Sequence, residues 1–225
     1  MTAQNIEFAI RNPDRLRLTE IFYSLQGESN TVGRPTVFVR LTGCPLRCHY
    51  CDTSYAFSGG KWWEFPTIEQ AVASHRTKFI TVTGGEPLAQ KACLKLLDRL
   101  CDLNYHVSLE TSGALDISEV DPRVTKVMDL KTPGSGESAK NRYENINYLK
   151  QQDQLKFVIC HRDDYEWAKS RLNEFQLPRR CEVLFSPGFR QLGARQLADW
   201  ILADRLPVRF QIQLHKYLWG DVPGR

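Results

Sequence analysis

Short apolar runs alternate with amphipathic stretches along most of the chain. The runs are rich in β-branched and aromatic residues, as buried strands are, whereas the stretches repeat apolar residues every three or four positions, as helices do. The predicted strands are 36–41, 79–83, 106–110, 126–130, 155–159 and 182–185, followed by a last run at 209–214. The predicted helices are 68–74, 91–103, 141–150, 165–175 and 194–204. Strands that alternate with helices predict parallel βα units, and hence an α/β fold.

Nearly every predicted strand ends in a turn rich in polar, glycine or cysteine residues. The five clearest turns are CPLRCHYC, TGGEP, ETSG, DLKTPGSG and FSPG. Any one of them is weak evidence, because βα loops need Gly and Pro simply to turn. In parallel α/β folds, however, the loops at the carboxyl ends of the strands meet on one face and build the active site. Five such loops, one of them with three cysteines, therefore predict a single active site on that face.

Composition and charge exclude several classes of protein. A chain of 225 residues fits one large domain, and its net charge of +4, without any basic run, implies no nucleic-acid partner. The slight positive excess suits an anionic small molecule. A mean hydropathy of −0.41 and the lack of a long apolar run predict no membrane span. The N-terminus lacks the apolar segment of a signal peptide, so a cytoplasmic location is expected.

The seven cysteines fall into two groups. Four are scattered among apolar neighbours and are predicted to be buried structural thiols, namely Cys93, Cys101, Cys160 and Cys181. The other three, Cys44, Cys48 and Cys51, follow a strand with the spacing C-x3-C-x2-C. Three close thiolates without a fourth nearby suit an iron–sulfur cluster with one open iron. Two alternatives stay open: a zinc site completed by His49, and a redox pair of Cys48 and Cys51.

This spacing, with Tyr50 before the last cysteine, resembles that of the radical S-adenosylmethionine enzymes, and TGGEP at 83–87 resembles their GGEP motif. The resemblance implies a 4Fe–4S cluster on the three cysteines, with S-adenosylmethionine on the fourth iron as the source of a radical. It implies cofactor contacts from Tyr50, Gly84, Gly85, Glu86, Glu110, Ser112, Lys131 and Ser186. Glu86 is expected to neutralise the methionyl ammonium. Glu110 could equally cap its turn through Ser112.

Four segments narrow the resemblance to one family. EIFYSLQGE at 20–28, VFVRLTGC at 37–44, CDT at 51–53 and QLHKYLWG at 213–220 are similar to the 7-carboxy-7-deazaguanine synthases. The similarity starts near residue 20, so residues 1–19 are expected to be a variable extension and 20–225 a single radical S-adenosylmethionine domain. The resemblance further implies an open, partial TIM-like barrel of about six parallel strands with its active site on the C-terminal face. It also implies a homodimer.

The same family implies a substrate and a set of contacts. Its members convert 6-carboxy-5,6,7,8-tetrahydropterin to 7-carboxy-7-deazaguanine with loss of ammonia, on the way to queuosine and other 7-deazapurines, and use Mg²⁺. A reducing partner such as flavodoxin or ferredoxin is expected. The expected substrate contacts are Leu25, Gln26, Gly27, Glu28, Arg40, Thr83 and His215. The Arg40 guanidinium suits the substrate carboxylate, and the Thr53 hydroxyl suits Mg²⁺. Asp52 is expected to cap a helix.

Two other functions remain compatible with the cysteine spacing. An activase of a glycyl-radical enzyme would need a protein partner and would consume S-adenosylmethionine stoichiometrically. A zinc-stabilised binding module would need no substrate, although a large α/β core has little need of a bound zinc ion to stabilise it.

Overall fold

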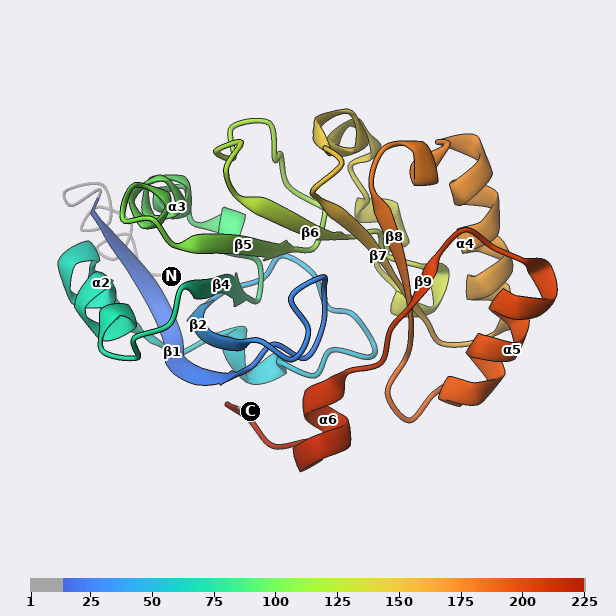
Figure 1. Cartoon of the computed structure of the whole chain (residues 1–225), viewed down its shortest axis with the longest axis horizontal. Coiled ribbons are helices and arrows are strands. Elements are labelled where there is room, and N and C mark those ends of the chain that lie inside the picture. The colour runs from blue at the N-terminus through green and yellow to red at the C-terminus, as the bar shows by residue number, and fades with distance from the viewer. Residues whose placement is uncertain (1–13, 225) are drawn as a thin grey trace.

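A curved sheet of nine strands runs through the computed structural model, which describes residues 14–224 (Figure 1). The strands are β1 (Arg15–Leu25), β2 (Pro35–Leu41), β3 (Lys61–Glu64), β4 (Phe79–Gly84), β5 (His106–Thr111), β6 (Thr125–Asp129), β7 (Gln154–Ile159), β8 (Glu182–Pro187) and β9 (Arg209–Phe210). Their order is β3-β1-β2-β4-β5-β6-β7-β8-β9. Every neighbouring pair from β2 to β9 is parallel. The two outer strands β3 and β9 are the sheet edges, so the predicted open, partial TIM-like barrel is confirmed.

Helices cover the outer face of this sheet. They are α2 (Phe65–Ala73), α3 (Ala92–Asp102), α4 (Arg162–Glu174) and α5 (Ala194–Asp204), whereas the short α6 (Leu214–Trp219) lies at the cavity. Figure 1 shows α2 and α3 at one end of the molecule, and α4 and α5 at the other. Short 3₁₀ helices, η1 (Ser54–Ala56), η2 (Pro87–Ala89), η3 (Pro133–Ser135), η4 (Ser138–Lys140), η5 (Tyr143–Tyr148) and η6 (Leu177–Arg179), occupy the loops. Within the described segment, none of the helices combines the length and apolarity that crossing a membrane requires.

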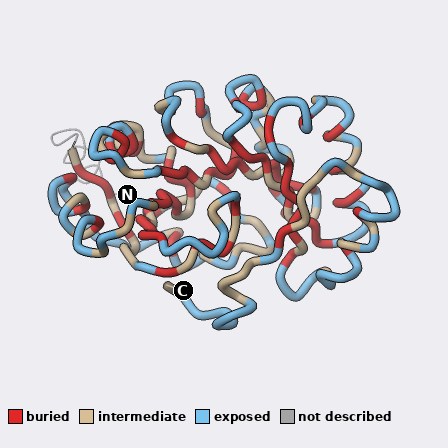
Figure 2. The backbone as a smooth tube through the Cα atoms, viewed as in Figure 1, coloured by how far each residue is buried: buried red, intermediate tan, exposed pale blue. Residues whose placement is uncertain are grey.

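The core lies between the strands and the helices, where buried residues follow the strands (Figure 2). Helix α3 shows why these sequences form these elements. It buries Cys93, Leu96, Leu97, Leu100 and Cys101, and this spacing of three and four residues places them on one helical face. Cys160 and Cys181 are also buried. The prediction that these four scattered cysteines are structural is thus consistent with their burial in the core.

Strand β1 was not predicted from the sequence. It begins at Arg15, and Leu16 and Leu18 point into the core with 0% and 1% of their surface exposed. The irregular pairing between Leu18 and Glu20 interrupts the alternation of polar and apolar residues, which hides the strand in the sequence. The boundary expected between residues 19 and 20 therefore falls inside β1. The part of the expected extension before residue 14 lies outside the described residues.

Two other predicted elements differ from the structure. The helix expected over 141–150 is the 3₁₀ helix η5, because the buried Asn145 amide donates to the carbonyl oxygens of Gly113 and Leu115 and holds the segment in place. The strand expected over 209–214 ends after two residues as β9. The backbone N–H of Leu214 donates to the Gly27 carbonyl at 3.0 Å, which draws the chain away from the sheet edge and into α6.

Candidate active site

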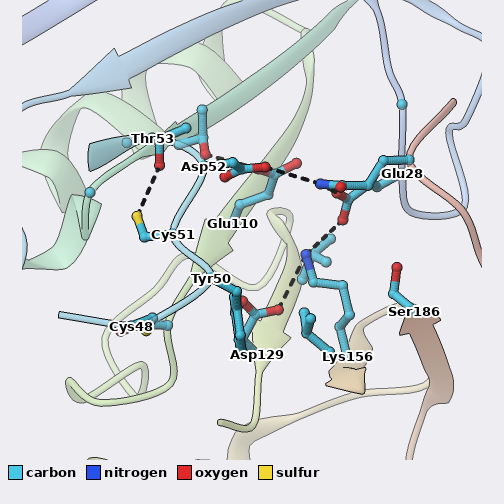
Figure 3. Close-up of a pocket in the computed structure, with 18 of the residues that line it drawn as sticks. Glu28, Cys48, Tyr50, Cys51, Asp52, Thr53, Glu110, Asp129, Lys156 and Ser186 are labelled. Carbon is cyan, nitrogen blue, oxygen red and sulfur yellow. Dashed lines mark hydrogen bonds and ion pairs between the residues drawn. The ribbon is translucent and has the colours of Figure 1, made fainter. Parts of the chain in front are cut away.

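One cavity opens at the carboxyl ends of the parallel strands, as the sequence predicts. Its walls include all the expected substrate residues, Leu25, Gln26, Gly27, Glu28, Arg40, Thr83 and His215. They also include Tyr50, Gly84, Gly85, Glu110, Ser112, Lys131 and Ser186 of the expected cofactor set, and Cys44, Cys48, Cys51 and Thr53 of the expected metal set. Residues that are far apart in the sequence thus meet in one cavity, and Figure 3 labels ten of those that line it.

The cysteine loop follows β2 and enters the cavity from one side. Cys44, Cys48 and Cys51 line the cavity and are half-buried. The opposite side of the loop is braced by the segment between β6 and β7, where the His49 N–H donates to the Ser135 carbonyl at 3.0 Å. A Cβ on Gly136 would come within 2.8 Å of the His49 ring, so only glycine leaves room for this contact. The contacts with Ser135 and Gly136 therefore hold the loop that carries the three thiols in place at the cavity.

The donor set of this loop suits an iron–sulfur cluster better than a single ion. A structural zinc requires four ligands around one ion, yet among residues 14–224 no three His, Cys, Asp or Glu side chains are placed to hold one. The His49 ring lies against Gly136, and His49 is not part of the cavity wall, so it is not placed as a fourth ligand. In a 4Fe–4S cluster each thiolate binds a different iron, so the three cysteine sulfurs can lie farther apart than ligands of a single ion.

The redox-pair alternative has no structural support either. The Cys51 N–H donates to the Cys48 carbonyl in a turn, and the next helical element, η1, starts only at Ser54. The described chain therefore lacks the helix N-terminus that would activate a Cys48–Cys51 pair. Burial raises the pKa of the Cys44 and Cys48 thiols above the usual value. These thiols are protonated at neutral pH until a metal centre displaces their protons.

Two consecutive glycines place bare backbone beside the first cysteine. Gly84 has a φ of +157°, and a Cβ there would lie 2.3 Å from the Leu41 carbonyl oxygen. A Cβ on Gly85 would lie 2.3 Å from the Gly43 oxygen and 2.8 Å from the Cβ of Cys44. Any larger residue would force the two loops apart. The glycines therefore let the turn after β4 pack directly against the backbone that leads into Cys44.

Glu86 lies behind the cavity wall rather than in it. Its carboxylate is 0% exposed and accepts hydrogen bonds from the Leu88 N–H at 3.0 Å, the Thr111 hydroxyl at 3.0 Å and the Ser112 N–H at 2.7 Å. Glu86 thus ties the turn after β4 to the end of β5 and positions Ser112. These hydrogen bonds do not test the expected interaction of Glu86 with the methionyl ammonium, which stays a prediction.

Glu110 hydrogen-bonds to other residues of the cavity wall and not to Ser112. Its carboxylate accepts from the Thr83 hydroxyl at 2.8 Å and from the Gln26 amide at 3.3 Å, so it does not cap the turn through Ser112. Burial, and then the nearby Glu28 carboxylate, raise the pKa of Glu110. The Gln26 amide also donates to the Thr81 hydroxyl at 3.0 Å. Glu110 therefore forms part of a hydrogen-bonded cavity wall.

Four charged residues pair deep in the cavity, and sequence reasoning missed two of them, Lys156 and Asp129. The Lys156 ammonium lies 2.6 Å from a Glu28 oxygen and 3.3 Å from an Asp129 oxygen (Figure 3). The Lys131 ammonium lies 2.6 Å from the other Asp129 oxygen. Burial opposes the charge of Lys156, but the carboxylates of Asp129 and Glu28 outweigh it and raise its pKa well above the usual value. The available signal was a charged residue inside each of two apolar strand runs, Lys156 in LKFVI and Asp129 in KVMDL.

The segment that contains α6 closes another side of the cavity. The Gln213 amide donates to Glu28 at 2.9 Å and to Asp52 at 3.2 Å, and the Lys216 ammonium lies 2.8 Å from Asp52. Asp52 therefore anchors the C-terminal segment instead of capping a helix, because the residue that precedes η1 is Thr53. Gln213 and Lys216 are further cavity residues that sequence reasoning missed.

Two residues expected to contact ligands, Arg40 and Ser186, also form hydrogen bonds within the protein. The Arg40 Nε donates to Glu20 at 2.8 Å. This is the one hydrogen bond of the Arg40 side chain within the described structure, so its two terminal nitrogens can still bind a ligand. The Ser186 hydroxyl donates to the Gln211 carbonyl at 2.9 Å, which fixes its oxygen at the cavity edge.

Comparison with known proteins places this site in a family. Residues 38–132 match the radical SAM superfamily. A 7-carboxy-7-deazaguanine synthase from Chlorobaculum tepidum is 44% identical over 208 residues, which cover 91% of this chain and 94% of that protein. One from Koribacter versatilis is 39% identical over 219 residues, which cover 91% of this chain and 97% of that protein. The chain belongs to the 7-carboxy-7-deazaguanine synthase family.

Membership of the 7-carboxy-7-deazaguanine synthase family confirms the resemblance seen in the sequence. It makes the chain a radical S-adenosylmethionine enzyme, so the zinc-stabilised binding module is excluded. The crystal structure of QueE from Escherichia coli superposes with a TM-score of 0.74, covers 96% of this chain and all of that chain, and is 20% identical. That similarity confirms the fold. The superfamily implies the 4Fe–4S cluster and S-adenosylmethionine, and the cysteine loop and the glycine pair fit both groups.

Gly27→Ala is expected to displace His215 from the cavity wall of this family member. A Cβ at position 27 would lie 2.0 Å from the His215 Nδ1, so the ring must move toward solvent. Burial lowers the pKa of His215 below 6.5 in the native protein, and removing that burial raises it again. NMR titration of the histidine ring protons should therefore show the His215 pKa rising in the variant.

The matched control is Gly193→Ala, because a Cβ there meets no atom closer than 3.9 Å. In that variant the His215 titration should be unchanged. An unaltered His215 pKa in Gly27→Ala would contradict the packing of the C-terminal segment against Gly27.

Proposed function

We propose that this enzyme converts 6-carboxy-5,6,7,8-tetrahydropterin to 7-carboxy-7-deazaguanine with release of ammonia. The observation that carries the proposal is a single cavity in which the three cysteines face a wall of polar groups suited to a pterin. Relatives named 7-carboxy-7-deazaguanine synthase match the chain over nine-tenths of its length, which supports the product. The product would enter the synthesis of queuosine and other 7-deazapurines, and so a tRNA modification pathway.

The pterin edge is proposed to bind along the segment from Leu25 to Glu28. Glu28 accepts from Gln213 on one carboxylate oxygen and from Lys156 on the other, which fixes the orientation of the carboxylate. Each oxygen retains a lone pair for an N–H of the guanidine-like pterin edge. Backbone groups of Leu25 and Gly27, with the side chains of Gln26, Thr83 and His215, complete the proposed substrate contacts.

The other end of the substrate carries a carboxylate. We propose that the free guanidinium nitrogens of Arg40 bind it, because a guanidinium fork matches a carboxylate in geometry and charge. Phe22 and Phe38 stack with ring centroids 4.8 Å apart and line the same cavity. These rings supply an apolar surface beside Arg40, which strengthens the ion pair by limiting water.

The cofactors are proposed to lie on the cysteine side of the cavity. The cluster on Cys44, Cys48 and Cys51 together with bound S-adenosylmethionine supplies the radical that removes a substrate hydrogen. The proposed contacts to S-adenosylmethionine come from Tyr50, Gly84, Gly85, Glu110, Ser112, Lys131 and Ser186, which line the cavity. Glu86 is proposed to act on the methionyl ammonium from behind the wall, through its charge and its hold on Ser112. Lys131 is buried and charged, which suits the methionyl carboxylate.

Mg²⁺ is proposed to bind the Thr53 hydroxyl. This oxygen belongs to a cavity-lining residue and lies 3.8 Å from the Cys51 sulfur. Mg²⁺ prefers oxygen ligands and keeps several waters, so one protein ligand together with substrate oxygens is sufficient. A homodimer, a cytoplasmic location, the absence of a nucleic-acid partner, and reduction by a flavodoxin or ferredoxin complete the proposal.

The proposal is tested by turnover of anaerobically reconstituted enzyme. The enzyme is incubated with 6-carboxy-5,6,7,8-tetrahydropterin, S-adenosylmethionine, Mg²⁺ and a reductant, and ammonia and deazaguanine are quantified. We expect equal amounts of both products and many turnovers per S-adenosylmethionine. A glycyl-radical activase would instead consume one S-adenosylmethionine per event. Absence of ammonia from fully clustered enzyme would refute the proposed reaction.

A further inference from the structure

The cysteine loop has an inner and an outer face with different chemistry. Residues of the inner face line the cavity, namely Cys44, Leu46, Cys48 and Tyr50. The residues between them, Pro45, Arg47 and His49, are exposed and do not line it. This alternation places the thiols toward the ligands and turns the intervening side chains toward solvent.

Two cations cover the backbone of the outer face. The Arg47 guanidinium donates to the carbonyls of Cys44 at 2.8 Å and Leu46 at 2.6 Å. The Lys140 ammonium, from η4, donates to the Pro45 carbonyl at 3.0 Å. The Lys140 side chain is 48% exposed. The two cations therefore sit on three consecutive carbonyls of the loop that carries the cysteines, and both face solvent.

The carboxylate nearest these cations is buried beneath them. Glu137 is 8% exposed; it accepts a hydrogen bond from the Arg47 N–H and lies 2.8 Å from the Lys140 ammonium. His49, the remaining titratable group on the outer face, is exposed. The surface offered by Arg47, His49 and Lys140, which we term the basic loop face, is thus positive at neutral pH.

We propose that the basic loop face binds an acidic flavin-containing protein that donates one electron. The inference rests on the proposed function, because that function requires electrons at the cysteines. Substrate and S-adenosylmethionine are proposed to fill the cavity side, so an electron has to arrive through the outer face. The outer face is short, exposed and positive, and complementary charge accelerates the encounter of two proteins.

The test measures cluster reduction directly. Stopped-flow bleaching of the visible absorption of the clustered enzyme is followed with reduced flavodoxin, which is acidic, and with the methyl viologen radical, which is a cation. In Arg47→Glu/Lys140→Glu, the second-order rate constant with flavodoxin should fall at least about tenfold. The rate with methyl viologen should stay the same or rise, because the reversed charge attracts a cation.

The matched control is Lys150→Glu/Arg205→Glu. Both residues are exposed, and they precede β7 and β9 at the opposite ends of the strands from the cavity. The flavodoxin rate should be unchanged in this control. Lys140→Glu alone provides a variant that keeps the Arg47 contacts to the loop. In the native enzyme the flavodoxin rate should also fall with rising salt.

The possible outcomes separate the two proposals. Equal slowing with both reductants would overturn the docking proposal, since the cations would then support the loop alone. An unchanged flavodoxin rate would also overturn it, since the donor would bind elsewhere. Native enzyme that bleaches with the expected charge dependence but forms no ammonia would refute the proposed function and still support the docking site. Native enzyme that neither reductant bleaches would overturn both.

Discussion

Cys48→Ala is expected to yield a protein without a complete cluster and with less than about one-thousandth of the native activity, because the cofactor carries the difficult chemistry. Cys48 lies between Cys44 and Cys51 on the inner face of its loop, where each thiol is proposed to bind a separate iron. After anaerobic reconstitution, the variant should lack the broad visible absorption that bleaches on reduction. Its iron and sulfide contents should fall well below those of the native protein.

The control for this prediction is Cys101→Ala. Cys101 is buried on α3 and does not line the cavity, so its loss should leave iron content and spectrum unchanged. A fully clustered, active Cys48→Ala protein would show that the C-x3-C-x2-C spacing does not hold the cluster. Loss of the cluster in Cys101→Ala would show that the scattered cysteines are more than structural.

Lys156→Met is expected to lower the free energy of unfolding by about 3–5 kcal/mol at neutral pH, the usual cost of breaking a buried ion pair. The substitution leaves the carboxylates of Glu28, Asp129 and Glu110 close together without their shared cation. Urea unfolding followed by circular dichroism, compared between the native protein and the variant, measures the difference.

The pH dependence of this loss has a definite sign. Burial raises the pKa of Asp129, but Lys131 and Lys156 outweigh it and lower the pKa below the usual value. Such a group stabilises the fold above its unfolded-state pKa, and the contribution is lost as the pH falls through the lower folded-state pKa. The raised pKa of Lys156 keeps its own contribution constant up to its unfolded-state value near 10.5. The deficit of Lys156→Met should therefore be largest between about pH 5 and 10 and shrink in acid.

Two further variants separate the buried pair from a general effect of charge. Lys169→Met removes a lysine that pairs with Glu166 and Asp204 on the surface, and should cost no more than about 1 kcal/mol. Adding Glu28→Gln to Lys156→Met should recover part of the loss, because one unpaired carboxylate is removed. A deficit below about 1 kcal/mol in Lys156→Met, or one that grows in acid, would contradict the ion-pair assignment.

The local features of this protein were readable from the sequence. The alternation of strands and helices depends on the period of apolar residues within each segment, so it can be recognised without knowledge of the fold. The cysteine spacing and the TGGEP turn also lie within short stretches of chain. Because parallel strands bring their carboxyl ends to one face, these local motifs were sufficient to predict a single active site there.

The tertiary structure alone decided which charged groups meet in that site. Lys156 and Glu28 are 128 residues apart in the chain, and Gln213 and Glu28 are 185 apart, yet both pairs form hydrogen bonds. Such contacts depend on strand order and register, which no single segment encodes. For the same reason the sequence did not reveal that β1 is part of the sheet or that Glu86 lies behind the cavity wall. The burial of a polar group is set by every element packed around it.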